Sequence, residues 1–155
     1  MTAIRHKHLK RLDVVFDTQP MYFITSCLQD RRHLLACDGA MRILVEEWTS
    51  ALSKHSWGVG RFVIMPDHVH FFCRPAVSAV SLSIFMMRWK EWTSKKLSRT
   101  LAAAQPIWQP KFFDHLLRSD ESYSEKWLYV RDNPVRAGLV ASQEDWKYQG
   151  YVHYP

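Results

Sequence analysis

Two apolar, β-branched segments separated by a Pro-Asp pair constrain this chain more than any other feature. Residues 61–65 (RFVIM) and 68–74 (HVHFFCR) both have the composition of a strand. Pro66 and Asp67 between them are typical of a tight turn. So short a connection excludes a crossover, so the two strands are predicted to pair antiparallel. The fold must therefore accommodate a hairpin at this point.

The segments before this hairpin predict a strand and then a helix. Residues 21–26 are aromatic and β-branched, which favours a strand. Residues 42–52 carry apolar side chains at roughly the helical period. Gly58 and Gly60 are expected to break the pattern before the strand at 61–65 begins.

The segments after the hairpin predict a second helix and then a fourth strand. An amphipathic helix is predicted from Ser78 or Ser81 to Arg99, because its apolar residues recur three and four apart. Residues 102–106 form a connector, and 111–117 predict a fourth strand.

A last helix is predicted to begin at Ser119 or Ser122. Glu125 is placed to complete a capping box on Ser122. The helix is expected to run to Asn133, because Pro134 cannot continue it.

The order is therefore strand, helix, strand, strand, helix, strand, followed by an appended helix. This order predicts an α+β fold, a ferredoxin-like sandwich in which an antiparallel sheet carries helices on one face. The chain of 155 residues has no repeat or low-complexity linker, so 1–155 is expected to form one domain. Residues 1–16 are treated as a basic arm and 147–155 as a tail.

The charge balance points to a partner that carries phosphate. The net charge is +6 and the pI is about 9.4, and cationic side chains that neutralise phosphates release counterions. The N-terminal arm supplies Arg5, Lys7, Lys10 and Arg11.

Other compositional features narrow the class of protein. No apolar run is long enough to span a membrane, and residues 1–10 are basic and lack the apolar stretch of a secretory signal, so a cytoplasmic location is expected. Three scattered cysteines favour reduced thiols over disulfides or structural zinc. Most of the seven tryptophans are expected in the core.

The hairpin's second strand carries a His-x-His pattern. Side chains two apart on a strand project from one face, so His68 and His70 are predicted side by side while Val69 points into the core. Two neutral imidazoles so placed suit a divalent metal. Spacing alone favours two surface histidines on a half-buried strand, because the His-x-His pattern is short. The remaining histidines are expected at the surface without a function: His6, His8, His33, His55 and His153.

The predicted last helix carries Tyr129 and Asn133 four residues apart, hence on one face. The amide oxygen of Asn133 is a plausible third metal ligand. Taken singly, Tyr129 also fits a core aromatic residue, and Asn133 fits a helix end before proline.

Three blocks together resemble a known family. These blocks are 63–71 (VIMPDHVHF), 108–118 (WQPKFFDHLLR) and 129–140 (YVRDNPVRAGLV). They are similar to the single-tyrosine HUH transposases of the insertion-sequence-200 type, and most similar to their REP-associated tyrosine transposase branch. The resemblance spans residues 22–148.

The resemblance implies a site and a reaction. His68, His70 and Asn133 match the positions that hold a divalent metal, Mg or Mn, and Tyr129 matches the nucleophile. The implied enzyme cleaves and rejoins single-stranded DNA beside palindromes folded as hairpins, through a 5′-phosphotyrosine intermediate. Phenols ionise near pH 10, far below alkyl alcohols, so such a phosphotyrosine bond is readily reversed.

The resemblance leaves several assignments open. Asp114 and His115 match a recurrent block without a chemical role, and Arg118 either touches phosphate or pairs with Asp114. Residues 17–20 lack the glycine with which the branch often recognises bases. Both monomers and homodimers occur among relatives. Beyond the arm, the residues expected to contact nucleic acid are Arg88, Lys95, Arg118 and Arg136.

Three different functions fit parts of the pattern. The first is a DNA-hairpin-binding protein that has lost catalysis. The second is a phosphoesterase that activates water, which would need carboxylates at the metal, whereas the adjacent Asp67 is expected to point off the His face. The third is an RNA-binding module that would expose Phe62 or Phe71 for base stacking.

Overall fold

A computed structural model of the protein describes residues 20–155. The predicted arm at 1–16, with Arg5, Lys7, Lys10 and Arg11, lies outside the described residues, as do positions 17–19 of the segment without glycine. No helix among residues 20–155 is both long and apolar enough to cross a membrane.

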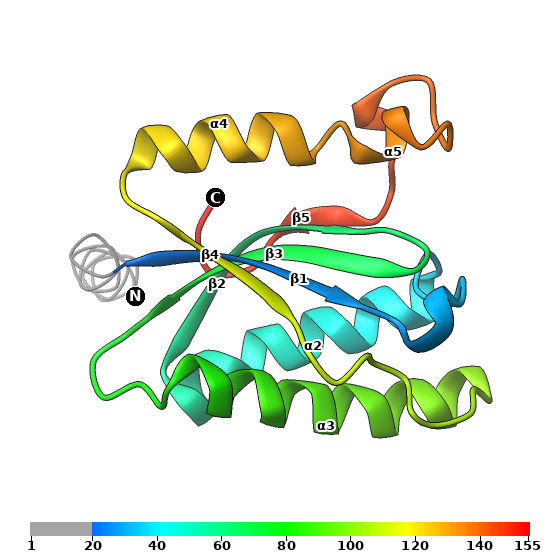
Figure 1. The fold of residues 1–155 in the computed structure, drawn as a ribbon, viewed down its shortest axis with the longest axis horizontal. Helices are drawn as coiled ribbons and strands as arrows, with labels where there is room; N and C mark the ends of the chain where they lie inside the picture. Colours follow the sequence, from blue (N-terminus) through cyan, green and yellow to red (C-terminus); the bar gives the residue numbers. More distant parts are fainter. Residues whose placement is uncertain (1–19) are drawn as a thin grey trace, which may run out of the picture.

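The centre of the fold is a five-stranded sheet in which every neighbouring pair is antiparallel (Figure 1). Its order is β4-β1-β3-β2-β5, and the first four positions have the arrangement of a ferredoxin-like sheet. The predicted α+β ferredoxin-like sandwich is therefore confirmed. The strands are β1 (Met21–Cys27), β2 (Trp57–Ile64), β3 (His68–Pro75), β4 (Phe113–Leu117) and β5 (Gln149–Tyr151).

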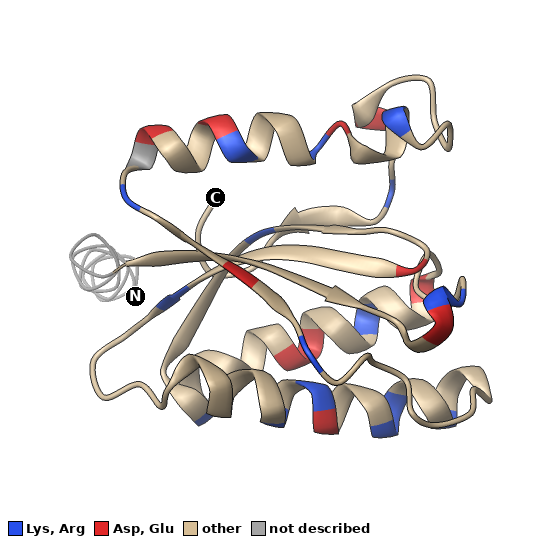
Figure 2. Ribbon diagram, in the orientation of Figure 1, with Lys and Arg blue, Asp and Glu red and all other residues tan. Residues whose placement is uncertain are grey.

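Helices cover both faces of this sheet. Two long helices, α2 (Asp38–His55) and α3 (Leu82–Leu101), lie side by side on one face, and α4 (Asp120–Val130) lies on the other (Figure 1). The appended helix therefore forms a third layer. Lys and Arg occur on helices of both outer layers rather than on one side alone (Figure 2). The short helices are η1 (Gln29–Arg31), α5 (Asn133–Arg136) and η2 (Gln143–Asp145).

Two hydrophobic cores follow from this layering. The larger core joins the sheet to α2 and α3 and is rich in stacked rings, with Trp48 packed against Phe71 and Trp89. The smaller core lies under α4 and centres on Phe72 and Trp127. Five of the seven tryptophans are buried, as predicted, and the cysteines are free thiols.

The glycines before the hairpin do not break the strand, contrary to the prediction. Strand β2 begins at Trp57 and passes through both Gly58 and Gly60, with a bulge between Val59 and Phe62. The ring of Tyr154 occupies the space where a Cβ at Gly60 would lie. The absence of a side chain at Gly60 therefore allows Tyr154 of the C-terminal segment to pack against β2, and the glycine does not mark a turn.

The C-terminal segment also differs from the tail expected at 147–155, because it contributes β5 to the sheet edge. Three residues with a central glycine carry too short a pattern for sequence analysis to detect. His153 follows the strand and is not a plain surface residue. Its Nδ1 accepts from the Val59 backbone at 2.9 Å, and its Nε2 donates to the Thr49 carbonyl at 3.2 Å.

The last predicted helix is divided in two. The hydroxyl of Ser119 caps α4 by accepting from the Ser122 backbone at 3.2 Å, so the capping box predicted on Ser122 is wrong. Helix α4 ends at Val130, and α5 begins at Asn133. Pro134 sits in the first turn of α5, where its missing N–H needs no partner.

The histidine hydrogen bonds predict a pH-dependent stability. Burial lowers the pKa of His153, although its bond to Thr49 opposes the shift. The folded protein therefore keeps this imidazole neutral, whereas the unfolded chain protonates it near pH 6.5. The free energy of unfolding should fall as the pH drops below 6.5, by up to about 1.4 kcal/mol per pH unit for this histidine.

Urea unfolding between pH 7.5 and 5, with a chelator present, measures this slope. The slope should be shallower in His153→Gln and unchanged in His33→Gln, which alters an exposed histidine. Equal slopes in wild type and His153→Gln would contradict the assignment.

Candidate active site

The His-x-His pattern lies on β3, on the face that α4 covers. His68 and His70 are partly buried, and their ring centroids are 4.8 Å apart with the planes nearly perpendicular. Val69 between them is fully buried in the core that α2 and α3 share with the sheet. The predicted side-by-side placement of the two imidazoles is therefore confirmed.

Asp67 orients the first histidine. His68 Nδ1 lies 2.7 Å from Asp67 Oδ1, and Arg31 Nε donates to Asp67 Oδ2 at 2.8 Å. Burial opposes ionisation, but the bonds from His68 and Arg31 prevail and lower the pKa of Asp67. The expectation that Asp67 points off the His face is wrong, because the turn folds its carboxylate back onto His68.

Thr25 orients the second histidine from the neighbouring strand. Its Oγ1 lies 2.8 Å from His70 Nδ1, since the antiparallel register places Thr25 directly opposite His70. The Phe23 ring stacks on the imidazole, with centroids 5.1 Å apart. Burial lowers the pKa of His70 to about 3, and the positive charges nearby add to the effect. His70 is therefore neutral at physiological pH.

This arrangement fits a divalent metal. Both Nδ1 atoms are engaged, and within residues 20–155 neither Nε2 atom has a hydrogen-bond partner. A partner at Nδ1 commonly fixes the ring and tautomer of a metal-binding histidine. In the described part of the chain no cluster of three His, Cys, Asp or Glu side chains could hold a metal. Further ligands would have to be of another kind, such as an amide oxygen.

Helix α4 brings the predicted nucleophile toward the histidines. Trp127 and Val130 are buried against the sheet, while Tyr129 is 63 % exposed, which excludes a core role for this ring. Lys126 lies three residues earlier on the same side of the helix. Its Nζ is 4.8 Å from the centroid of the Phe23 ring, the ring that stacks on His70. Contacts thus connect His70 to Phe23 and Phe23 to Lys126, which lies in the same helical turn as Tyr129.

Arg136 of α5 links the tyrosine to the predicted amide ligand. Its Cζ lies 4.1 Å from the centroid of the Tyr129 ring, and its guanidinium donates to Asn133 Oδ1. Tyr129 and Asn133 are therefore associated even though the helix is interrupted between them. The amide oxygen of Asn133 is engaged by Arg136, so metal binding there requires an exchange of partners.

The site is surrounded by positive charge. Lys126, Arg136 and Arg31 each lower the pKa of His70 through their charge, which places all three near the imidazole. Asp67 pairs with Arg31, but within residues 20–155 no ion pair joins Lys126 or Arg136 to a carboxylate, so these two cations favour an anion. A phosphodiester meets that requirement, and it would also compete for the Arg136 guanidinium.

Within residues 20–155, the other predicted nucleic-acid contacts lie apart from this cluster. Arg88 and Lys95 are exposed on α3, across the sheet, and Lys95 pairs with Glu91 at 3.3 Å. Arg118 follows β4 and is exposed. Among the described residues no ion pair joins Asp114 to Arg118, so the pairing considered for them is not formed.

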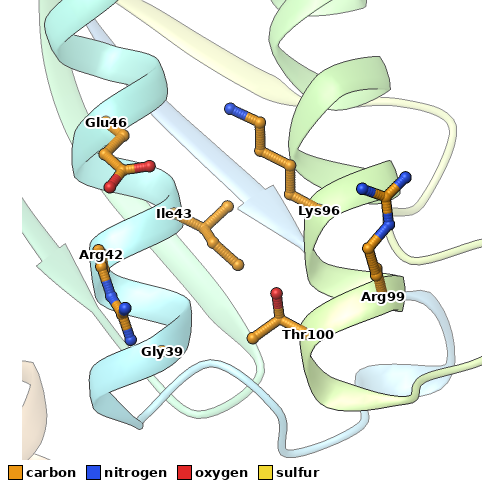
Figure 3. Close-up of a pocket in the computed structure, with 7 residues that line it drawn as sticks. All are labelled: Gly39, Arg42, Ile43, Glu46, Lys96, Arg99 and Thr100. Carbon is orange, nitrogen blue, oxygen red and sulfur yellow. The ribbon is translucent and has the colours of Figure 1, made fainter.

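A pocket of about 250 Å³ lies between α2 and α3 (Figure 3). These helices pack on the face of the sheet opposite the one that carries His68 and His70. The pocket is lined by Arg42, Lys96 and Arg99. Lys96 pairs with Glu47, whose carboxylate oxygen is 2.5 Å from its Nζ. Because the pocket and the histidines lie on opposite faces of the sheet, the pocket is separate from the candidate active site.

The residues that orient this site carry no signal in the sequence. Thr25, Phe23 and Lys126 contact it from strand β1 and helix α4, elements distant in sequence from the histidines. Only the register of β1 against β3 and the docking of α4 reveal them. Asp67 was visible in the turn, but its direction depends on the turn's backbone.

Comparison with known proteins decides the family. A family model described as "Transposase IS200 like" matches residues 18–126. The chain belongs to the IS200-like transposases. It is thus a member of an enzyme family, as the three sequence blocks predicted. The match ends before Tyr129, so the roles of Tyr129 and Asn133 rest on the last block and on the geometry.

Two relatives are similar over most of their length. A REP-associated tyrosine transposase of Escherichia coli K12 is 29 % identical over 131 residues, covering 84 % of this chain and 75 % of the relative. A Haemophilus influenzae protein assigned the same function is 26 % identical over 144 residues, covering 84 % and 79 %.

Solved structures confirm the IS200-like fold. The structure of a REP-associated tyrosine transposase bound to a REP hairpin aligns with a TM-score of 0.69 at 23 % identity, covering 84 % of this chain and 75 % of that one. A Deinococcus radiodurans protein assigned as a transposase aligns with a TM-score of 0.55 at 16 % identity, covering 74 % and 90 %.

The Thr25 bond predicts a specific effect on metal affinity. Thr25→Val keeps the side-chain volume but removes the partner of His70 Nδ1. Loss of such an orienting partner typically weakens metal binding about 10- to 100-fold. Calorimetric titration with Mn²⁺ should show this loss, whereas Thr49→Val, at a helix-surface threonine, should bind as wild type. Equal affinities for wild type and Thr25→Val would refute the orienting role.

Proposed function

We propose that this transposase cleaves and rejoins single-stranded DNA beside hairpin-forming palindromes, with a divalent metal and a 5′-phosphotyrosine intermediate. The observation that carries the proposal is the contact chain from His70 through Phe23 and Lys126 to the helical turn of Tyr129. It associates a metal-compatible histidine pair with an exposed phenol inside a cluster of cations.

The metal would be held by His68 and His70 through their Nε2 atoms and by Asn133 through its amide oxygen. Mg or Mn is the ion that the family resemblance implies, and imidazole ligands suit Mn better than Mg. When bound, such an ion offsets charge on the phosphate oxygens and aligns the phosphate for in-line displacement.

Tyr129 would act as the nucleophile. Its phenolic oxygen forms a bond to phosphorus as the bond to the 3′ oxygen breaks, which leaves a 5′-phosphotyrosine and a free 3′ hydroxyl. Rejoining reverses the step, with the 3′ hydroxyl attacking and the phenol leaving. Arg136, next to both Tyr129 and Asn133, would hold the phosphate in place of its present partners.

Hairpin DNA is the proposed substrate, supported by the solved structure of a REP-associated tyrosine transposase of similar fold that is bound to a REP hairpin. Arg31, Lys126 and Arg136 would bind the backbone at the cleaved phosphate. A chromosomal substrate also implies a cytoplasmic protein, and the proposed site is compatible with a monomer or a homodimer. Further backbone contacts are proposed at Arg5, Lys7, Lys10, Arg11, Arg88, Lys95 and Arg118.

A catalytically inactive hairpin-binding protein is the competing function that the experiment must exclude. An RNA-binding module and a water-activating phosphoesterase fit the structure less well. Phe62 and Phe71, the rings that an RNA-binding module would expose, are 2 % and 0 % exposed. A water-activating phosphoesterase would need carboxylate ligands, and Asp67 is already engaged by His68 and Arg31.

A covalent-adduct assay tests the proposal. Hairpin oligonucleotides with single-stranded flanks, incubated with the protein and Mn²⁺, should give a protein–DNA band on a denaturing gel. Tyr129→Phe should abolish the band because it removes the attacking oxygen, and a chelator should do the same. Tyr151→Phe, at an exposed tyrosine of β5, should leave it intact. Tight hairpin binding without any adduct would support the inactive binding protein.

The charge cluster predicts a salt effect on binding. Arg136→Gln should weaken single-stranded DNA binding and reduce the slope of log affinity against log salt by about 0.7, the value for one lost phosphate contact. Lys147→Gln removes the same charge from the surface ion pair with Asp38 and should leave the slope unchanged. Fluorescence anisotropy between 50 and 300 mM salt gives both slopes; identical slopes for Arg136→Gln and wild type would contradict the contact.

A further inference from the structure

Strand β4 exposes a phenylalanine, Phe113, whose exposure no packing within residues 20–155 explains. Phe113 is 68 % exposed, whereas Phe23, at 7 %, and Phe72, at 0 %, are buried on the same face of the sheet. A single exposed apolar side chain is common on protein surfaces, so the significance of this ring depends on its position relative to the active site. Its position on an edge strand leaves one side of the ring open to a ligand.

The strand register places this ring in line with the active site. Phe113 lies opposite Thr25, and Thr25 lies opposite His70. Directly opposed residues of an antiparallel sheet project from the same face, so the three side chains form one row across β4, β1 and β3. Two strand spacings separate the ends of this row, about 10 Å. A base next to a phosphate held at the histidines would lie within that reach.

The charge around the row favours a polyanion over an apolar protein surface. Lys111 is exposed two residues before Phe113, and Lys126 lies over the Phe23 ring in the adjacent row. Arg136 adds charge near His70. An exposed ring flanked by cations is the combination with which proteins bind unpaired bases, the ring stacking on the base and the cations holding the backbone.

We propose that Phe113 stacks on an unpaired base of the single strand, next to the phosphodiester at His68 and His70. The inference rests on the proposed function for its substrate. Stacking uses no base-edge hydrogen bond, so Phe113 contributes affinity for any base and positions the strand without specifying its sequence. The proposal also assigns a function to the edge strand β4, which pairs with β1 at Thr25.

Site-specific fluorescence tests this inference. Hairpin oligonucleotides carry 2-aminopurine at one single-stranded position at a time and are bound to Tyr129→Phe protein, which prevents cleavage. One position should be quenched strongly on binding. In the Phe113→Leu background that quenching should disappear and affinity should fall by between about 5-fold and about 150-fold. Phe113→Trp should retain both.

Tyr151→Leu is the matched control, because Tyr151 is 60 % exposed at the opposite edge of the same sheet. It should leave quenching and affinity unchanged. Thermal melting checks that each variant folds, which is expected because neither side chain is buried.

Two results would overturn the inference. One is equal affinity and quenching in the Phe113→Leu and wild-type backgrounds at every position, while protein with Tyr129 still forms the covalent adduct. The other is a drop in sedimentation mass in Phe113→Leu without a change in DNA binding, which would assign the ring to a protein interface. Position-specific quenching that depends on Phe113, in a protein that forms no adduct, would support stacking and refute the proposed catalysis.

Discussion

The hydrogen bond between Thr25 and His70 depends on the antiparallel register of β1 against β3, and the candidate active site depends on that register. It places a hydroxyl directly opposite an imidazole, 2.8 Å away. A slip of one residue would turn every side chain of β1 to the other face and bury the hydroxyl in the larger core. The register therefore also determines which ring nitrogen of His70 remains available, because it places Thr25 at Nδ1.

The layering of the fold explains how a helix late in the chain reaches a strand in its middle. The larger core joins α2 and α3 to one face of the sheet, so the opposite face is free to accept α4. Helix α4 is held there by two buried side chains, Trp127 and Val130, and by the Lys126–Phe23 contact. Tyr129 is thus presented at the surface of a helix whose other side is packed.

Positive charge is the second constraint on the site. Burial and three neighbouring cations keep His70 neutral, so it is ready for a metal without first losing a proton. Asp67 compensates Arg31, whereas among the described residues Lys126 and Arg136 form no ion pair and are left to bind an anion. Arg136 now contacts the Tyr129 ring and the Asn133 amide, so phosphate binding and release of Asn133 are expected to be coupled.

Much of the fold followed from the sequence because its patterns are local. The Pro66-Asp67 turn determined the hairpin, and period-two alternation on β3 separated His68 and His70 from Val69. The failures have non-local causes. Gly60 belongs to a strand because Tyr154, almost a hundred residues later, packs on it, and β5 exists only through pairing with β2.

The residues of the candidate site also fall into those that the sequence reveals and those that only the fold brings in. The histidines and Tyr129 were visible as residue types at a given spacing, and the family blocks linked them. Thr25, Phe23 and Lys126 carry no motif and enter the site only through strand register and helix docking. Asp67 was misplaced because the direction of a side chain in a turn depends on backbone angles that composition does not specify.

The central claim is that one metal at the histidine pair lies beside Tyr129. Paramagnetic broadening by Mn²⁺ in protein with ¹³C-labelled tyrosine tests it without DNA and without activity. We predict that the Tyr129 signals broaden at a lower Mn²⁺ concentration than those of Tyr151 and Tyr22, and that His70→Gln abolishes this difference. Sharp Tyr129 signals at a Mn²⁺ concentration that saturates the histidines would contradict this placement of the metal.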